Sequence, residues 1–146
     1  MDSGDLLYLR LPVPEFERAQ RQQKAELLLA AQGILGLDAM TPGDGDFAFG
    51  LDFLREGARK NHLPYVSANL ADEGSTLLFP ATLVVERAGM KLGITGATTD
   101  EAPIPGVRVL EPLAALRGAV ESLRAQGVDR VIVLSHLGSR QDRTLV

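Results

Sequence analysis

The chain has no cysteine among its 146 residues. A disulfide framework, a thiolate zinc site and a cysteine nucleophile are therefore excluded, and any metal must be bound by oxygen or imidazole ligands. Long apolar runs are also missing, since the longest is far shorter than the roughly 20 residues that a membrane-spanning helix needs. Residues 1–5 have neither the basic nor the apolar region of a signal peptide. We therefore expect no membrane span and no targeting signal in this chain.

Positive charge is not in excess. Lys and Arg number 15 against 19 Asp and Glu, which gives a net charge of -4. The basic residues that cluster, Arg55, Arg59 and Lys60, lie on a predicted amphipathic helix, so nucleic acid is not an expected partner. A hydrophobic content of 45% with 23% charged residues is typical of a folded chain of this length, and we expect a single domain with a real core.

Helical periodicity runs through three stretches, residues 15–33, 51–61 and 112–126. The first follows two prolines and leads to Gly36, as helix boundaries often do. The apolar positions are Phe16, Ala19, Leu27, Leu28, Ala31 and Ile34 in the first stretch, Leu51, Leu54 and Ala58 in the second, and Leu113, Leu116, Val120 and Leu123 in the third. We predict three helices, the last two amphipathic and packed on a sheet.

Short apolar segments rich in β-branched residues lie between these helices and predict strands. They cover residues 37–40, 65–68, 82–87, 91–96 and 131–134. The third and fourth are close enough for a hairpin, whereas the others alternate with helices as in parallel βαβ units. The predicted fold class is therefore α/β, a mixed sheet flanked by helices. Residues 98–106, with their two prolines, are the expected long surface loop.

Polar residues stand at three strand ends. Ser3-Gly4-Asp5 begins the chain, Thr41-Pro42-Gly43-Asp44-Gly45-Asp46 follows residues 37–40, and Ser135-His136-Leu137-Gly138 follows residues 131–134. Because ligands bind at the carboxyl ends of strands in an α/β sheet, we expect these groups on one sheet edge. Glycine beside an acidic residue lets the backbone bend sharply and directs a carboxylate over that edge. Carboxylates with an imidazole suit a divalent metal such as Mn, Zn or Fe.

The same residues have a simpler interpretation. Asp and Gly at strand ends are more often turn formers, and a lone His136 is more often a hydrogen-bonded structural residue. His62, near a helix end, fits a partner of the helix dipole. A calcium loop at Asp44-Gly45-Asp46 is excluded because the glycine spacing is one position off and no glutamate closes the loop. A metal site and simple turns both stay open.

The order of these pieces is more specific than any one of them. Along the chain stand Asp2-Ser3-Gly4-Asp5, a predicted helix, residues 37–50, Ser67-Ala68-Asn69-Leu70, residues 91–96, and Val133-Leu134-Ser135-His136-Leu137-Gly138. This order resembles the 5'-nucleotidases of the calcineurin-like metallophosphoesterase superfamily over nearly the whole chain. The resemblance implies part of a metallophosphoesterase-like sandwich.

The resemblance also implies roles for individual residues. Asp5 stands where the family has the carboxylate that bridges two metals, Asp44 where it has an amide ligand, and His136 where it has an imidazole ligand. Asn69 matches an Ala-Asn at a strand end, for which we expect a structural role. The implied cofactor is a divalent metal, Mn, Zn, Fe, Co or Mg, which binds the phosphoryl oxygens and activates a water.

This sequence departs from the family pattern at Gly45, where the family has a histidine that contacts the phosphate. Glycine supplies neither that charge nor that proton, a loss of ~100-fold or more in rate by the usual size of an acid/base contribution, so we assign no catalytic residue. The family's opening Asp-x-His and closing Gly-His-x-His motifs are also absent. We therefore expect residues 1–146 to form one domain of the 5'-nucleotidase N-terminal type, incomplete at both ends and lacking its first strand and last ligand segment.

Two functions compete on this evidence. The first is a metal-dependent phosphoester hydrolase for nucleotides or similar phosphate esters, active when complete and weak or inactive as this chain alone. The second is a non-catalytic binding or assembly module that keeps the fold after losing the metal centre. Whether the chain is an enzyme stays open here, and robust metal-dependent turnover by this chain would exclude the second function.

The expected partner is a small phosphate ester, and the resemblance indicates a bacterial cell envelope location. A missing first strand leaves N–H and C=O groups unpaired along an apolar sheet edge. Three outcomes follow from such an edge: a homo-oligomer formed through it, exchange of segments between copies, or a requirement for a partner. A single monomeric species in sedimentation at high concentration would contradict this expectation.

Overall fold

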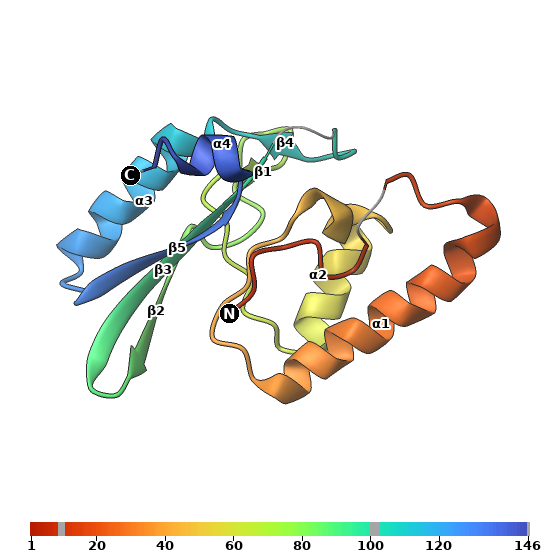
Figure 1. Ribbon diagram of the computed structural model, residues 1–146, viewed down its shortest axis with the longest axis horizontal. Coiled ribbons are helices and arrows are strands. Elements are labelled where there is room, and N and C mark those ends of the chain that lie inside the picture. Colours follow the sequence, from red (N-terminus) through yellow and green to blue (C-terminus); the bar gives the residue numbers. More distant parts are fainter. Residues whose placement is uncertain (9–10, 100–102, 146) are drawn as a thin grey trace.

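A computed structural model describes residues 1–8, 11–99 and 103–145. Two groups of elements lie side by side in Figure 1, with the N-terminal segment running between them. One group holds a three-stranded sheet, and the other holds two packed helices. The helices are α1 (Arg18–Leu35), α2 (Leu51–Lys60), α3 (Pro112–Ala125) and the short α4 (Ser139–Asp142), with 3-10 turns at η1 (Glu15–Glu17) and η2 (Asp44–Phe47). The strands are β1 (Leu70–Ala71), β2 (Thr82–Arg87), β3 (Met90–Thr98), β4 (Arg108–Val109) and β5 (Arg130–His136).

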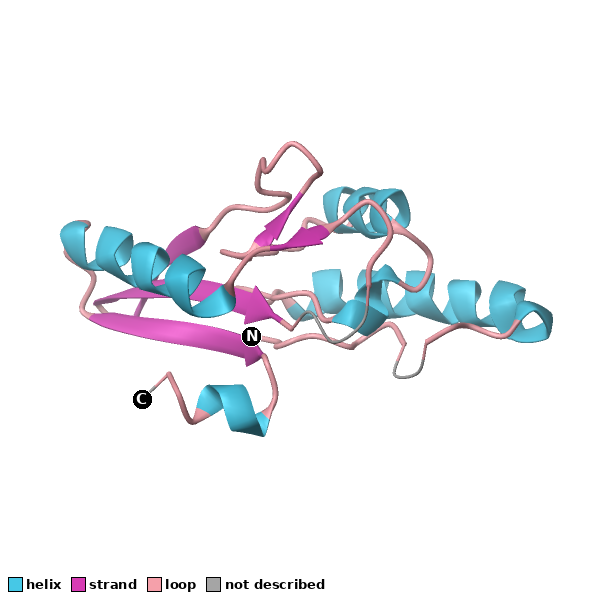
Figure 2. Ribbon diagram, turned by 90° about the horizontal axis from the view of Figure 1, so that it is seen from above, coloured by secondary structure: helices cyan, strands magenta, loops and turns pink. Residues whose placement is uncertain are grey.

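The larger sheet is mixed, with the strand order β2-β3-β5. β2 and β3 form an antiparallel hairpin, and its turn residues Ala88 and Gly89 both have positive φ (52° and 74°), as tight hairpin turns require. β3 and β5 are parallel and α3 connects them, with Ile94 opposite Ile132 in the register. Figure 2 shows α3 lying along this sheet. The predicted hairpin, the βαβ unit and the α/β class with a mixed sheet are confirmed.

Two of the predicted strands are not regular strands. Within residues 37–40 and 65–68 only Met40 and Tyr65 form bridges, and each bridge is an isolated parallel pair. Met40 pairs with Asp2 on one side and with Tyr65 on the other, so three extended segments lie in parallel. Pro42 comes two residues after Met40, and Pro64 directly precedes Tyr65. Because proline has no backbone N–H, a regular ladder cannot continue past these positions. The prediction was wrong about the ladders, although the parallel order holds.

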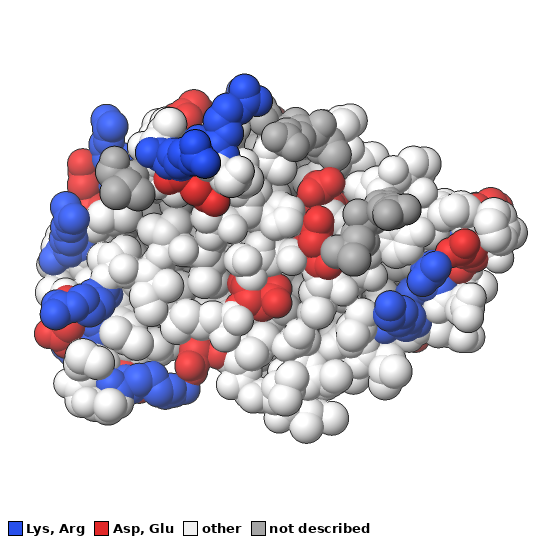
Figure 3. Space-filling view, viewed as in Figure 1, with Lys and Arg blue, Asp and Glu red and all other residues white. Residues whose placement is uncertain are grey.

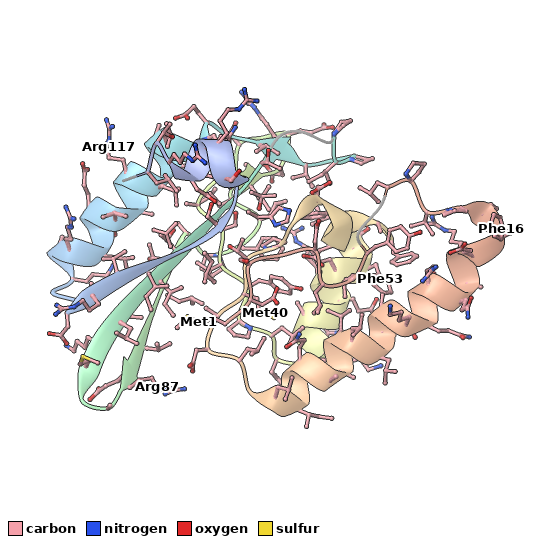
Figure 4. All side chains as sticks on the ribbon, viewed as in Figure 1. Met1, Phe16, Met40, Phe53, Arg87 and Arg117 are labelled. Atoms are coloured by element: carbon pink, nitrogen blue, oxygen red, sulfur yellow. The ribbon has the colours of Figure 1, made fainter. Side chains whose placement is uncertain are left out.

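Helix α1 exposes most of the residues that the periodicity assigned to its apolar face. Phe16, just before it, is 88% exposed, Leu27 70% and Ile34 87%, whereas its buried residues are Ala25 and Leu29. Figure 4 shows Phe16 at the outer end of the molecule and Met40 in its middle. The predicted face was therefore wrong. The real contact is narrow because Leu29 packs directly against Gly57 of α2, where an added Cβ would lie 2.5 Å from Leu29 Cδ1.

Helices α2 and α3 differ in what they cover. α3 packs on β3 as predicted, with Leu116, Ala119 and Leu123 buried. α2 packs against α1 and η2 instead of the sheet, so that prediction was wrong. Its Leu54, which is fully buried, joins a core that includes Leu29, Met40 and Tyr65. The core is thus divided between the helix pair and the sheet.

The remaining expectations on the fold have mixed outcomes. Residues 100–102 of the predicted loop 98–106 lie outside the described residues, and β4 begins just after that loop.

Among the residues that the structure describes, β2 and β5 each have one sheet edge without a strand partner, so association through an open edge stays a prediction. No helix within the described ranges is both long and apolar enough to cross a membrane.

Candidate metal centre

Three side chains from distant parts of the chain meet beside the end of β5. Asp5 follows the bridge at Asp2, Asp44 is the first residue of η2, and His136 is the last residue of β5. One ligand atom of each lies within 4.8 Å of the others, and all three residues are half-buried. A group of acidic side chains lies near the middle of the face shown in Figure 3, with the Lys and Arg side chains farther out. The structure therefore brings together the three residues that the sequence singled out as metal ligands.

The His136 ring is held in one orientation. Its Nδ1 lies 2.9 Å from the carbonyl oxygen of Ser3, and because a carbonyl only accepts, Nδ1 is the donor. Its Nε2 faces Oδ1 of Asp5 at 3.5 Å and Oδ1 of Asp44 at 3.4 Å. A backbone carbonyl that fixes the far nitrogen is the usual support of a metal-binding histidine. The near nitrogen is thus presented to two carboxylates.

The donor set fits a single divalent cation. Coordination bonds of about 2.0–2.2 Å to nitrogen and oxygen place neighbouring ligand atoms roughly 3 Å apart, close to the separations from Nε2 to the two carboxylates. A cation among the three groups would also neutralise two carboxylates that otherwise repel each other. Two carboxylate oxygens and one imidazole suit Mn, Zn or Fe. Asp5, Asp44 and His136 would hold the ion.

The Asp5 carboxylate is restrained before any ion binds. Its Oδ1 accepts a hydrogen bond of 2.8 Å from the backbone N–H of Gly45. Burial raises the pKa of Asp5, the Gly45 N–H and the nearby His136 lower it, and the nearby Asp44 raises it again. The net direction is upward, so Asp5 keeps its proton to a higher pH than a free aspartic acid does. A bound cation requires the ionised form, and metal binding therefore weakens in acid.

A third acidic residue, Asp46, supports the backbone of the site and was not assigned a role from the sequence. It is 1% exposed. Its carboxylate accepts backbone hydrogen bonds from Asp5 at 3.0 Å, Leu7 at 2.9 Å and Gly43 at 2.8 Å. One buried carboxylate thus ties together the two segments that carry Asp5 and Asp44. The sequence offers one signal for this role. Asp46 directly precedes Phe47 in a glycine-containing turn, and a buried carboxylate there can accept hydrogen bonds from backbone N–H groups.

Gly45 is required by the local packing. A Cβ added there would lie 1.8 Å from the carbonyl oxygen of Tyr8 and 2.9 Å from Oδ1 of Asp5. The backbone at Tyr8 therefore occupies the space into which any side chain at position 45 would project. The chain path therefore leaves no room at position 45 for the histidine that the family resemblance predicts there.

Asn69 is not part of the cluster. It is fully buried, its Nδ2 donates to the Thr98 carbonyl at 2.8 Å, and its Oδ1 accepts from the Thr98 N–H at 3.0 Å. The side chain therefore replaces a missing strand partner for the end of β3. This agrees with the structural role that was expected for it.

The stability of the metal-free chain is expected to fall as the pH rises from about 4 to about 7. Burial raises the pKa of Asp46 to about 6 from its ordinary value of 3.8, although its three N–H partners lower it. The folded chain therefore binds this proton more tightly than the unfolded chain, so the contribution is fully present below the ordinary pKa and is lost as the pH passes 6. Between pH 4 and pH 7 the expected loss in the free energy of unfolding is about 2 kcal/mol.

Urea unfolding at pH 4 and pH 7 in the presence of a chelator measures this loss. Asp46→Asn has no proton to release, so the variant should show a clearly smaller difference between the two pH values. An equal difference in both proteins would contradict the assignment to Asp46. The raised pKa of Asp5 acts in the same direction and accounts for any remaining slope.

Comparison with known proteins identifies relatives of the chain. It is 34% identical over 112 residues to the probable 5'-nucleotidase of Treponema pallidum, an alignment that covers 70% of this chain and 19% of that protein. The crystal structure of the 5'-nucleotidase precursor from Thermus thermophilus superposes with a TM-score of 0.77 at 30% identity, over 99% of this chain and 29% of that one. No protein-family model matches the sequence.

A third likeness shows the fold. The calcineurin-like phosphoesterase YfkN from Bacillus subtilis superposes with a TM-score of 0.74 at 23% identity, over 94% of this chain and 48% of that chain. The relatives named 5'-nucleotidase, at 34% and 30% identity, show that the chain belongs to the calcineurin-like metallophosphoesterase superfamily, and the likeness to YfkN shows the same fold. Within that superfamily the chain is related to the 5'-nucleotidases. It spans about a fifth of the length of the curated relatives that it matches.

Proposed function

We propose that this chain carries the metal-binding part of a hydrolase for nucleotides or similar phosphate esters. The observation that supports it is the convergence of Asp5, Asp44 and His136, with Nε2 of the histidine presented to both carboxylates. The relatives named 5'-nucleotidase point to the same chemistry. Because the chain spans only a part of these relatives, residues outside it complete the substrate site in this proposal.

Each residue of the centre has a defined task in this proposal. A bound divalent cation supplies the charge that binds phosphoryl oxygens and lowers the pKa of a water. Asp5 and Asp44 provide the negative charge that holds the cation, and His136 offers one nitrogen because Ser3 fixes the other. Asp46 keeps the backbone at Asp5 in place. Position 45 donates no proton, so leaving-group protonation falls to water or to residues beyond this chain.

One observation favours a second candidate, a non-catalytic module that keeps the fold. The Tyr8 carbonyl fills the position next to Gly45, so a phosphate-contacting side chain could not simply be restored there. A module of this kind would bind a phosphate ester, or a metal alone, without turnover. The two candidates therefore differ in whether the bound phosphate ester is hydrolysed, and not in whether the metal binds.

The deciding experiment combines metal content with hydrolysis. After dialysis against Mn²⁺ or Zn²⁺, the chain should retain about one ion and hydrolyse p-nitrophenyl phosphate and AMP weakly, and only when loaded. Asp5→Asn keeps an oxygen at this position but removes a ligand charge, so it should reduce both metal affinity and turnover by about tenfold. Glu121→Gln, an exposed change on α3, is the matched control and should alter neither.

The outcomes separate the candidates. Metal retention with no turnover supports the module. Hydrolysis that survives both Asp5→Asn and His136→Ala contradicts the proposed centre, because the activity then comes from elsewhere.

A further inference from the structure

A cavity opens at Asp5, which is one of its lining residues. Its volume is about 560 Å³, within the range of small-molecule sites. It lies between the N-terminal segment and α1, which are neighbours in Figure 1. Its lining includes Asp2, Asp5, Leu7, Tyr8, Arg21 and Lys24. Asp5 therefore belongs both to the metal centre and to the wall of this cavity.

The cavity is electrically polar. Asp2 and Asp5 line the cavity from the N-terminal segment, and Arg21 and Lys24 line it from α1. The two cations are three residues apart on α1 and therefore share a helix face. A cation bound at Asp5 would offset the negative charge of Asp2 and Asp5, and the positive charge of the α1 residues would then remain. The cavity would then attract an anion that extends from the metal centre.

Arg21 and Lys24 differ in whether their charged groups already have partners within the chain. The Nε of Arg21 donates to Glu17 at 2.7 Å, and its guanidinium lies 5.7 Å from the centre of the Tyr8 ring. Lys24 is exposed and has no ion-pair partner among the residues that the structure describes. Among the described residues of the cavity wall, Lys24 is thus the cation without an ion-pair partner, whereas Arg21 is engaged with Glu17 and the Tyr8 ring.

The glycine at position 45 is what allows this wall to form. The Tyr8 carbonyl sits where a Cβ of residue 45 would be, and the N–H of Leu7 is bonded to the buried Asp46. This path carries Tyr8 past the metal centre toward α1. Glycine at position 45 therefore leaves room for the backbone of Tyr8. Tyr8 then lines the cavity together with Arg21 and Lys24 of α1.

We propose that this cavity is a second anion subsite of the metal centre, with Lys24 as its main contact and Arg21 in support. Its ligands are phosphate esters that carry another anionic group beyond the phosphate held at the metal, such as a nucleoside diphosphate or a bisphosphate. The subsite rests on the proposed function, because its first phosphate is the one bound by the cation at Asp5, Asp44 and His136.

A pair of non-hydrolysable phosphonates tests this subsite by binding alone. In the chain loaded with Mn²⁺, 4-carboxybenzylphosphonate should bind about ten times more tightly than benzylphosphonate, since one charge-assisted contact distinguishes them. The ratio should fall to about one in Lys24→Gln. Lys60→Gln on α2, outside the cavity lining, is the matched control and should keep it. Isothermal titration calorimetry measures both affinities, and Mn²⁺ titration without phosphonate measures metal loading.

The outcomes separate the subsite from the proposed function. Equal affinities for the two phosphonates in the unmodified chain would overturn the subsite and leave the metal centre standing. A ratio that survives in both Lys24→Gln and Arg21→Gln would also overturn it. A loaded chain that binds neither phosphonate would overturn the proposed function and the subsite together.

Discussion

Replacing His136 with alanine is expected to lower the affinity for Mn²⁺ or Zn²⁺ by at least about 100-fold. The change removes one of three ligands, and the two remaining carboxylates then face each other without the nitrogen that completes the set. Asp5 and Asp44 alone leave most of a cation's coordination to water. Equilibrium dialysis with elemental analysis, before and after loading, gives the affinity directly.

Two further variants make this result specific. His62→Ala removes the other histidine, which is exposed and outside the cluster, and should leave the affinity unchanged. Asp44→Asn keeps an oxygen ligand at its position and loses only charge, so it should cost about tenfold, less than His136→Ala. An affinity that is unchanged in His136→Ala, with the fold intact by circular dichroism, would contradict the centre.

The parts of the fold that follow from local patterning were predictable from the sequence. The hairpin between β2 and β3 has a short glycine-containing turn, and α3 carries an amphipathic pattern that ends at Gly127. The clustering of Asp5, Asp44 and His136 was also predictable, because each follows an extended segment and parallel segments end at one edge. Periodicity and turn chemistry act over a few residues, and they gave these elements correctly.

The parts that depend on distant contacts were not predictable. Phe16, Leu27 and Ile34 have helical spacing, yet they are exposed, because the helix contact is set by Leu29 against Gly57. No local rule identifies that glycine as a point of helix contact. Met40 and Tyr65 make single bridges instead of ladders for a similar reason, since the segments beside them decide how far the pairing runs.

The structural roles of Asp46 and Gly45 beside the ligand cluster were not assigned from the sequence. Asp46 is an acidic residue in a turn like Asp44 beside it, and only the fold shows that one points to the ligand cluster while the other is 1% exposed and bound to three N–H groups. Gly45 could be interpreted from the sequence only as a missing histidine. The structure adds that the Tyr8 backbone fills the vacated space.

Gly45→Ala is expected to destabilise the fold by about 2–3 kcal/mol, because overpacking of this kind forces backbone to move. The new Cβ would lie 1.8 Å from the Tyr8 carbonyl oxygen, which is backbone and not a flexible side chain. The shift would also disturb the bond from the Gly45 N–H to Asp5, so metal affinity should fall with stability. Urea unfolding and Mn²⁺ titration of the same variant measure the two effects.

Gly118→Ala is the matched control for this prediction, since Gly118 lies in α3 and a Cβ there would meet no atom within 4 Å. It should be neutral or stabilise the chain by up to about 1 kcal/mol, because alanine favours a helix. Gly45→His tests the stronger claim that the family's histidine cannot be restored by one substitution. Its larger side chain should cost at least as much stability as alanine and give no gain in hydrolysis. A Gly45→His chain that folds with full stability and gains turnover would show that the Tyr8 segment yields easily, and the packing argument at position 45 would then be wrong.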